Sequence, residues 1–458
     1  MTVMPLRPRL DSSPPDPVET AADLARVFAD KASVIDESTA FPRENFRLLH
    51  EAGLLALTAP MELGGRGAGL ATTSEVIRMI ARGEPSTALI LIMQYINLAT
   101  LPKGRWPQHL VRRVVADAVE KGALINALRV EPELGTPIRG GLPATTARRT
   151  AGGWLISGRK IYSTGIQGLT WAIVWAKTDE VEPRVGAFLV PADAPGLSVE
   201  RTWNPLGMRA TGSHDALLED VEVPLDHAAD IRLPLEWDAR GEGQAAWFGT
   251  LPGALYTGVA EAARNWLVGF LKTRAPTNLG TPLATVPRIQ QAVGEIEELI
   301  AVNRRLILSA ARDYDEGRPF SQSEAGLIKV VTTENAIAAV EKALKLTGNH
   351  GVSRNNPLER HHRDVLCGRI HFPPGRHGAH WCRPGRAGFH IKRRRLCLLN
   401  SLDTSATTTP RRRLSAPARS LTAIISRPRR RSTRTAASTA CSSPSIPPLR
   451  KASSSPST

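Results

Sequence analysis

Two segments between residues 126 and 165 decide the fold: Asn126-Ala-Leu-Arg-Val-Glu-Pro-Glu-Leu-Gly-Thr-Pro137 and Gly152-Gly-Trp-Leu-Ile-Ser-Gly-Arg-Lys-Ile-Tyr-Ser-Thr-Gly165. The first contains a Glu-Pro turn followed by Gly and Thr, and the second reads as a strand that ends in an aromatic residue and two hydroxyl residues. A turn that contains glycine lets backbone N–H groups approach the acceptor atoms of a ligand closely. Each segment alone fits an ordinary turn or strand, but their order and spacing favour a shared ligand site.

The sequence on either side of these segments divides the chain into three regions. Residues 18–122 repeat apolar residues at steps of three and four, which is typical of helices. Residues 123–235 change to short β-like runs separated by Pro, Gly and Asp, and residues 236–372 return to long helical runs. After a flexible N-terminus (1–17), we therefore predict an α+β multidomain protein. It has a helical domain, a mostly antiparallel β-barrel-like domain and a C-terminal helical bundle.

Individual runs give the expected elements of the last two regions. Strands are predicted at Gly153–Ile156, Trp171–Ala176, Val185–Val190 and Ala216–Val223, and long helices at Gln244–Thr273, Gln290–Tyr314 and Gln322–Leu346. Each of these helices is long enough to cross a bundle.

The net charge of +16 is concentrated at the C-terminus. Residues 373–458 contain 18 of the 59 Lys and Arg residues but only one of the 43 Asp and Glu residues. Residues 1–372 therefore contain 41 basic and 42 acidic residues. Because a nearly neutral body offers no basic groove, the composition argues against nucleic-acid binding by the body of the protein. Residues 373–458 are rich in Arg, Ser and Pro and are expected to be a disordered tail.

Three explanations of this basic tail stay open. It can be a nucleic-acid-binding arm, or a solvated tail without a role. It can also be the product of a frameshift near Pro373, because suitable codons for residues 374–386 read in a shifted frame as an amphipathic helix. A frameshift would replace the last helix of the bundle, so we would expect such a chain to be poorly stable or inactive.

Cysteine usage and the N-terminus indicate the compartment. The four cysteines do not pair at metal-ligand spacing and do not form a disulfide framework, so we expect no metal site and a reducing cytoplasm. Residues 1–17 are rich in Pro and lack the apolar stretch of a signal peptide. The sequence has no apolar run of about 18 residues, so we expect no membrane span.

Further motifs extend the pattern on both sides of the central segments. Phe41-Pro42 and the glycine-rich loop that ends at Gly67 precede them, and Asp220-Val-Glu-Val-Pro224 follows them. With the central segments, these motifs resemble the acyl-CoA dehydrogenase superfamily over residues 20–372. The resemblance implies the helical, β and helical domains of that fold and a flavin cofactor, FAD or FMN.

The same resemblance assigns roles around the flavin. It implies that the pyrimidine edge is held by Val130, Glu131, Gly135 and Thr136. It also implies that Tyr162 lies against the flavin face and that Thr164 lies near its reactive edge, with Ser163 between them. Hydrogen bonds and ring contacts at that edge are how a protein tunes a flavin.

In the C-terminal region the resemblance implies contacts between subunits of a homotetramer. Arg274 falls where the family binds the diphosphate of a neighbouring subunit's flavin, a task that suits a bidentate guanidinium. Lys345 and Gly348 fall in a segment that also touches the neighbouring cofactor.

Other charged residues divide between structural and chemical roles. We expect Arg209 to be structural. The Glu and Arg residues of 359–364 are expected to form an ion-pair network that holds the bundle. His214 is a candidate acid or base, because the unperturbed pKa of histidine lies near neutrality.

The departures from the family pattern bear on the mechanism. Dehydrogenation needs a carboxylate base near the substrate, but Phe372 occupies the usual position of the Glu and Phe248 occupies the alternative one. By contrast, Arg369-Ile370-His371 and Lys160-x-x-x-Thr164-Gly165 resemble the flavin monooxygenase branch of this fold, in which a His and a hydroxyl group help reduced flavin to activate O₂.

We therefore predict a flavin oxidoreductase that uses O₂, with Thr164 and His371 as catalytic residues. Its substrate would be an acyl-CoA or a small organic molecule, and its partner a flavin reductase or an electron-transfer protein. A true acyl-CoA dehydrogenase with a non-standard base stays an alternative.

Overall fold

The computed structural model describes residues 15–134, 142–236, 242–318 and 321–371. Several predictions fall outside these ranges: those for Gly135 and Thr136, for Phe372 and for the basic tail 373–458. They stay predictions.

The chain begins with helices, and a side chain caps the N-terminus of the first and fourth of those described. These helices are α1 (Pro17–Ser38), α2 (Arg43–Glu51), α3 (Leu70–Gly83), α4 (Pro85–Thr100) and α5 (Gln108–Lys121). Asp16 accepts a hydrogen bond from Val18 N at 2.7 Å where α1 starts, and Glu84 accepts from two backbone N–H groups where α4 starts. Each cap satisfies N–H groups that have no partner inside the helix. The apolar helix α4 is buried on nearly all sides, as its sequence predicts.

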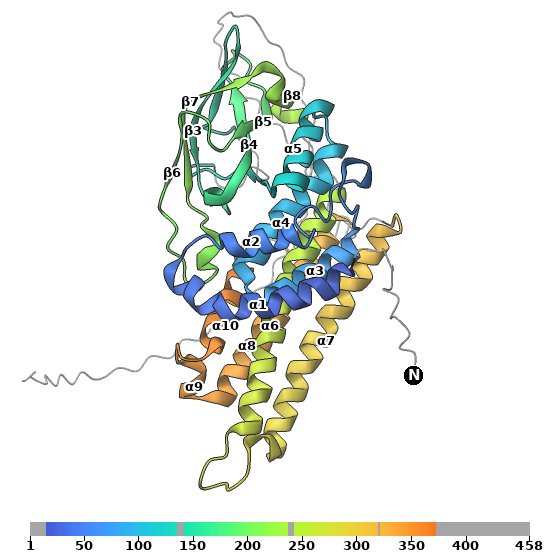
Figure 1. The fold of residues 1–458 in the computed structure, drawn as a ribbon, viewed down its shortest axis with the longest axis vertical. Helices are drawn as coiled ribbons and strands as arrows, with labels where there is room; N and C mark the ends of the chain where they lie inside the picture. The colour runs from blue at the N-terminus through green and yellow to red at the C-terminus, as the bar shows by residue number, and fades with distance from the viewer. Residues whose placement is uncertain (1–14, 135–141, 237–241, 319–320, 372–458) are drawn as a thin grey trace, which may run out of the picture. The chain divides into compact units, whose positions relative to one another are not determined.

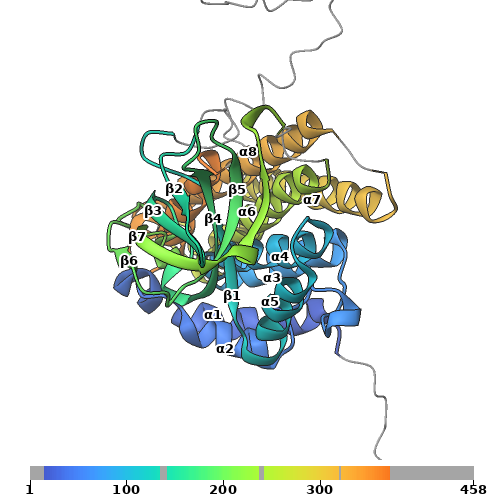
Figure 2. The same cartoon turned by 90° about the horizontal axis from the view of Figure 1, so that it is seen from above.

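A β domain follows. Its strands are β1 (Leu124–Leu128), β2 (Thr146–Arg149), β3 (Gly153–Lys160), β4 (Leu169–Thr178), β5 (Val185–Pro191), β6 (Leu197–Glu200), β7 (Asp215–Pro224) and β8 (Ala228–Arg232). They form one sheet in the order β6-β7-β3-β2-β4-β5-β8, with β1 paired to β4. The pairings of β4 with β1 and with β2 are parallel and the others antiparallel. Figure 2 shows β1 running beside α4 and α5, where apolar residues of α5 and of the sheet share one core.

The four strands expected from the sequence correspond to β3, β4, β5 and β7, whereas β1, β2, β6 and β8 were not expected. β2 and β6 are four residues long and carry exposed polar residues, so they show no clear alternation. β1 is buried at four of its five positions, and a short apolar run of that kind does not distinguish a strand from a helix.

The C-terminal bundle is built around α6 (Glu242–Thr273). It packs with α7 (Pro287–Asp315) and α8 (Gln322–Thr347), and α9 (Asn349–Val352) and α10 (Pro357–Leu366) follow. Figure 1 shows α6, α7 and α8 extending away from the β domain, with α1–α4 between. The three long helices confirm the expected bundle, and the helical, β and helical order is the predicted fold class.

Glycines let α6 lie close to its neighbours on two sides. A Cβ on Gly249 would lie 2.6 Å from Ala325 O of α8, and a Cβ on Gly258 would lie 2.3 Å from Arg78 O of α3. Because backbone atoms cannot yield as a flexible side chain can, these positions set the distance between the helices.

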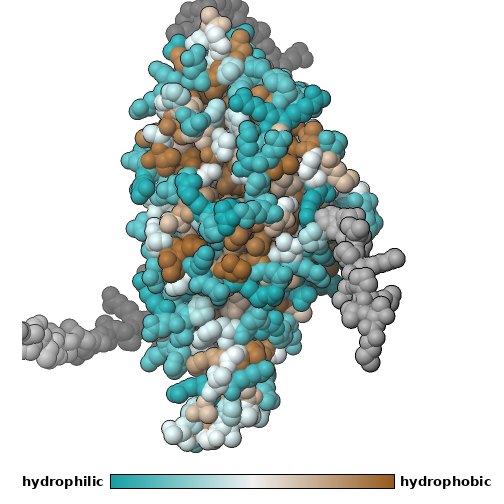
Figure 3. Space-filling model, viewed as in Figure 1, coloured by the Kyte–Doolittle hydropathy of each residue, from teal (hydrophilic) through white to brown (hydrophobic). Residues whose placement is uncertain are grey.

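No helix in the described residues is long and apolar enough to cross a membrane. On the face shown in Figure 3, polar side chains separate several smaller groups of apolar ones.

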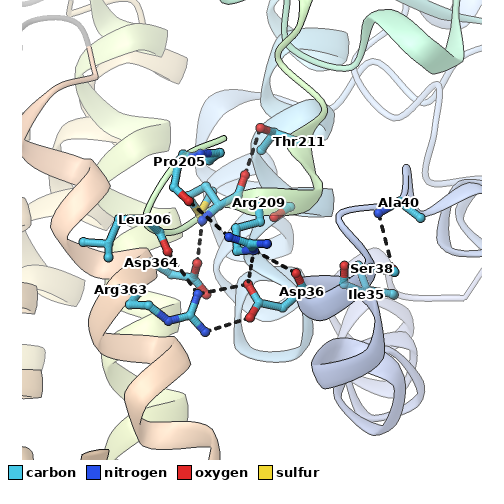
Figure 4. A network of polar contacts seen from close by, with 12 residues as sticks. Ile35, Asp36, Ser38, Ala40, Pro205, Leu206, Arg209, Thr211, Arg363 and Asp364 are labelled. Carbon is cyan, nitrogen blue, oxygen red and sulfur yellow. Dashed lines mark hydrogen bonds and ion pairs between the residues drawn. The ribbon is translucent and has the colours of Figure 1, made fainter. Parts of the chain in front are cut away.

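A charged network joins the three regions (Figure 4). Arg363 of α10 contacts Asp36 of α1 at 2.7 Å and the Leu206 carbonyl, which follows the β6 strand, at 3.0 Å. It also pairs with Glu359 one turn earlier in α10. Arg209 donates to the Asp36 carbonyl at 3.0 Å. Arg209 is therefore structural. Of the Glu and Arg residues in 359–364, Glu359 and Arg363 take part in a network that extends beyond the bundle, whereas the buried Arg360 Nε has no hydrogen-bond partner among the described residues.

Asp364 lies beside this network and is buried. Its Oδ1 accepts a hydrogen bond from Met208 N at 2.6 Å. Burial, helped by the nearby carboxylates of Asp36 and Glu84, raises the pKa of Asp364 to about 7 against the opposing effects of the Met208 bond and Arg360. Near neutral pH, folding therefore favours the protonated acid.

We expect Gly258→Ala to destabilise the protein by about 1–3 kcal/mol, because the new methyl group would meet the α3 backbone. Gly294→Ala in α7 is the matched control, since a Cβ there has no neighbour within 4 Å. It should stabilise by up to about 1 kcal/mol through helix propensity. Urea unfolding of both variants checks this, and equal effects would contradict the proposed close contact.

The raised pKa of Asp364 predicts a pH dependence of stability. Between the unfolded pKa and the folded value of about 7, the folded state binds more protons, so stability falls as pH rises through this window. Asp364→Asn keeps the acceptor for Met208 N without the charge. At pH 8 we expect its free energy of unfolding, measured with denaturant, to exceed that of the parent by about 1 kcal/mol or more. Its free energy of unfolding should also depend less on pH between pH 5 and 8. Asp313→Asn, at an exposed ion pair, should not flatten it.

Candidate functional site

The two segments that decide the fold lie side by side. Ile161 N donates to Val130 O at 2.9 Å, and Asn126 Nδ2 donates to Thr164 O at 2.9 Å. The end of β1 and the end of β3 therefore form one continuous surface. Val130 contributes its carbonyl to this junction, as a backbone contact and not through its side chain.

A buried ion pair fixes the junction. Lys160 Nζ lies 2.6 Å from Glu131 Oε1, and the two side chains are 0% and 1% exposed. Glu131 also accepts from Ala144 N, Thr145 N and the Thr145 hydroxyl, while Lys160 donates to the Trp175 carbonyl. The Glu131 carboxylate is thus occupied by protein donors, which leaves its backbone for the cofactor contact expected from the sequence.

Opposing effects act on the ionisation of this pair. Burial alone would raise the pKa of Glu131, but Lys160, the Thr145 hydroxyl and Ala144 N lower it overall. Burial lowers the pKa of Lys160 to about 8 against the opposing attraction of Glu131. Both residues are therefore charged near neutral pH.

Tyr162 and Ser163, which follow Lys160 closely in the chain, have side-chain groups that the described protein residues leave exposed or unpaired. Tyr162 has a φ of +55°, which non-glycine residues rarely adopt. Tyr162 is 62% exposed, and its ring and that of Trp203 are in an edge-to-face arrangement with centroids 6.3 Å apart. The Ser163 hydroxyl is buried and has no hydrogen-bond partner among the described residues. An exposed ring held by a strained backbone and an unpaired buried hydroxyl indicate a bound ligand at this place.

The Thr164 hydroxyl starts a chain of three hydroxyl groups. Thr164 Oγ1 lies 3.1 Å from Ser213 Oγ, Ser213 Oγ lies 2.9 Å from Thr211 Oγ1, and Thr211 Oγ1 lies 2.9 Å from Met208 O. A carbonyl only accepts, so Thr211 must donate to it. Ser213 then donates to Thr211, and Thr164 donates to Ser213, because this is the one arrangement in which all three contacts are hydrogen bonds. Thr164 therefore faces any ligand as an acceptor.

Comparison with known proteins agrees with this geometry. Family models for the N-terminal, middle and C-terminal domains of acyl-CoA dehydrogenases match residues 18–102, 130–221 and 251–373. The putative acyl-CoA dehydrogenase YdbM of Bacillus subtilis (strain 168) is 37% identical over 359 residues, which span 78% of this chain and 92% of YdbM. The chain belongs to the acyl-CoA dehydrogenase superfamily. It is therefore an oxidoreductase whose cofactor is a flavin.

Solved structures of other proteins are similar over most of the chain. KijD3 in complex with FMN and a dTDP-linked amino sugar is 26% identical, covers 80% of this chain and 91% of KijD3, and has a TM-score of 0.68. Butyryl-CoA dehydrogenase from Megasphaera elsdenii shares the fold, with 21% identity, 80% and 95% coverage, and a TM-score of 0.72. The match of the C-terminal family model ends at residue 373, where the composition changes.

A flavin fits the residues present in this acyl-CoA dehydrogenase relative. Tyr162 offers an exposed ring, Ser163 an unpaired hydroxyl and Thr164 an acceptor, all at the junction that Val130 helps to form. These would hold the flavin, and the flavin would supply electron transfer to or from the substrate.

The residues expected to bind a neighbouring subunit's flavin lie elsewhere. Arg274 follows the end of α6 and is exposed, and Lys345 and Gly348 are exposed at the end of α8. The two ends are neighbours, because Phe270 and His350 have ring centroids 5.1 Å apart. Figure 1 places this end of the bundle away from the β domain. A single chain therefore does not bring Arg274 to Tyr162, and the contribution across subunits stays a prediction.

The two histidines considered as acid or base differ in setting. His214 Nδ1 accepts from Trp203 N at 3.0 Å, and burial and Arg201 lower the pKa of His214. It therefore supports the loop that carries Trp203. His371 Nδ1 lies 2.6 Å from the hydroxyl of Tyr256 in α6. In the described part of the chain, no hydrogen bond or ring contact joins His371 to Thr164.

Some participants were not recognised from the sequence. Asn126 begins the first segment quoted above, whereas Thr211 and Ser213 lie just before β7, and their amide and hydroxyl contacts depend on loops that only folding brings together. Tyr256 stands in an otherwise apolar stretch of α6, and a lone tyrosine there is a weak signal of a buried polar partner.

The buried pair should be essential to the site. Lys160→Met would leave Glu131 charged and unpaired, at a cost of roughly 3–5 kcal/mol, and should weaken flavin binding. Glu131→Gln in the same chain should restore part of the stability, because it removes the orphaned charge and keeps an acceptor. The control is Lys121→Met at the exposed pair with Asp117, which should cost less than about 1 kcal/mol. Unfolding by urea and flavin titration measure both effects; equal losses in the two Lys variants would contradict this role.

Proposed function

We propose that this protein uses a reduced flavin and O₂ to oxygenate a small organic substrate. The proposal is carried by the direction of the hydroxyl chain at Thr164. Reduced flavin carries a hydrogen on N5, whereas oxidised flavin has only a lone pair there. An acceptor hydroxyl at the reactive edge therefore matches the reduced form, and a donor hydroxyl would match the oxidised form.

The surroundings of the site support the same choice. Phe248, at the alternative position of the family's carboxylate base, belongs to α6 and packs against the bundle core. Among the residues that the structure describes, no carboxylate hydrogen-bonds to Tyr162, Ser163 or Thr164. A proton acceptor for α,β-dehydrogenation would have to come from outside this group.

When bound, reduced flavin supplies two electrons for the activation of O₂. In this proposal Tyr162 packs on the ring, and Thr164 holds the reactive edge as an acceptor. KijD3, 26% identical, was solved with FMN, which supports a flavin mononucleotide as one candidate cofactor.

A second candidate is an acyl-CoA dehydrogenase with a non-standard base, which would pass electrons to an electron-transfer protein. The similarity to YdbM, named a putative acyl-CoA dehydrogenase, favours it. In that case the flavin would be reduced by the acyl-CoA, and no reductase would be needed.

The preference for reduced flavin is testable by binding. We expect the full-length protein to bind reduced FMN or FAD more tightly than the oxidised form. Ser213→Ala frees the hydrogen of Thr164 to become a donor, so it should shift the ratio of the two dissociation constants toward the oxidised form by about tenfold, equivalent to about 1.4 kcal/mol. Anaerobic titration of both redox forms measures the ratio.

The control for this experiment is Ser157→Ala, whose hydroxyl bonds to exposed Asp220 in the same domain and should leave the ratio unchanged. Tighter binding of oxidised flavin by the parent, or no shift in Ser213→Ala, would contradict the proposed direction of the hydroxyl chain.

The reaction of the bound flavin separates the two candidate functions. Anaerobic addition of butyryl-CoA should not bleach the oxidised protein, and O₂ added to the reduced protein should give a transient flavin species. Bleaching by the thioester would instead select the dehydrogenase.

A further inference from the structure

Tyr256, which is buried, and His371, which is half-buried, form a polar pair in the bundle that the site described above does not use. Tyr256 lies in α6, is 0% exposed, and has its hydroxyl 2.6 Å from His371 Nδ1. The two rings have centroids 5.8 Å apart. Their elements are far apart in sequence, so the contact depends on the packing of the last turn of the described chain against α6.

We propose that Tyr256 is a positioning residue that holds His371 as a neutral hydrogen-bond donor, with its proton on Nε2. The proposal rests on the proposed function, in which His371 would serve the oxygenation. It deepens that function by assigning the tautomer of the histidine and the residue that sets it.

The direction of the hydrogen bond follows from the partners available. The Tyr256 hydroxyl has no hydrogen-bond partner other than His371 among the residues the structure describes. If Nδ1–H donated to the phenol, the buried phenol hydrogen would have no acceptor, which costs free energy. The phenol therefore donates, and Nδ1 accepts. Burial, together with Cys367 and Asp364, raises the pKa of Tyr256 well above its usual range, so the phenol keeps its proton.

The turn that carries His371 is fastened to α8. Lys329 has a fully buried side chain, and its Nζ donates to the Gly368 carbonyl at 2.6 Å. Arg369 pairs with Glu334 at 2.8 Å. His371 N reaches Cys367 O at 3.4 Å. The imidazole thus contacts α6 directly, and the turn that carries His371 is attached to α8.

The charges around the ring disfavour the imidazolium. Lys329 from α8 is the ionisable group that acts on it, and burial together with Lys329 lowers the pKa of His371 to about 4. Glu334 of α8 is engaged by Arg369, and Asp364 of α10 is turned to Met208. A neutral imidazole with Nδ1 occupied has no lone pair left for a substrate proton. It can only donate through Nε2, which suits negative charge that develops on an oxygen atom.

Nuclear magnetic resonance of the full-length protein labelled with ¹⁵N-histidine tests the tautomer directly. His371→Asn assigns the signal. We expect the parent to show a neutral ring protonated at Nε2 from pH 5.5 to 8. Tyr256→Phe, which removes one oxygen atom without changing the ring, should raise the midpoint of titration by one pH unit or more and mix the tautomers. Tyr95→Phe is the matched control, because Tyr95 is equally buried but donates to Leu54 O. It should change nothing at His371.

An Nδ1-protonated ring in the parent, or an unchanged His371 signal in Tyr256→Phe, would overturn the proposal. The parent spectrum alone decides the tautomer if Tyr256→Phe fails to fold. The product yield of the oxygenation gives a second readout. Tyr256→Phe should lower this yield about tenfold when it is introduced into the parent. It should not lower the yield when it is introduced into His371→Asn. If every variant lacks oxygenation while the resonance pattern is as expected, the proposed function fails and the positioning of His371 by Tyr256 stands.

Discussion

The ion pair between Lys160 and Glu131 is the interaction on which the site depends. It joins the end of β3 to the turn after β1 in a place that water does not reach. A buried pair of this kind adds little net stability when it is complete and costs several kcal/mol when one partner is removed. Its value here is geometric: it fixes the backbone on which Tyr162, Ser163 and Thr164 stand.

Two further constraints place that backbone among the helices. Glycines bring α6 against α3 and α8, and Arg363 ties α1, the loop before Arg209 and α10 together (Figure 4). Both constraints depend on atoms that lie close together away from solvent. A misplaced methyl group would clash there, and an unpaired charge would not be solvated. The β domain is thereby held at one end of the bundle.

Thr164 at the site and His371 in the bundle share one property: a neighbour sets the hydrogen-bonding role of each. The hydroxyl chain makes Thr164 an acceptor, and Tyr256 leaves His371 as a donor. An acceptor at the reactive edge suits a reduced flavin, and a neutral donor suits an oxygen atom that gains charge. Neither group resembles the carboxylate base that α,β-dehydrogenation requires, which supports oxygenation within a superfamily that includes named dehydrogenases.

Sequence alone determined the superfamily, the order of helical and β regions, and the long helices α6, α7 and α8, because these follow from local periodicity and from motifs within single segments. It also indicated Tyr162, Ser163 and Thr164. It did not indicate β1, β2, β6 or β8, whose short runs gain their identity from their sheet partners. The pairing of Glu131 with Lys160, the direction of the chain from Thr164, and the contact of Tyr256 with His371 were decided by tertiary structure. Each of them depends on atoms brought together across 29 to 115 residues, and no local pattern carries the direction of a hydrogen bond between groups so far apart in the chain.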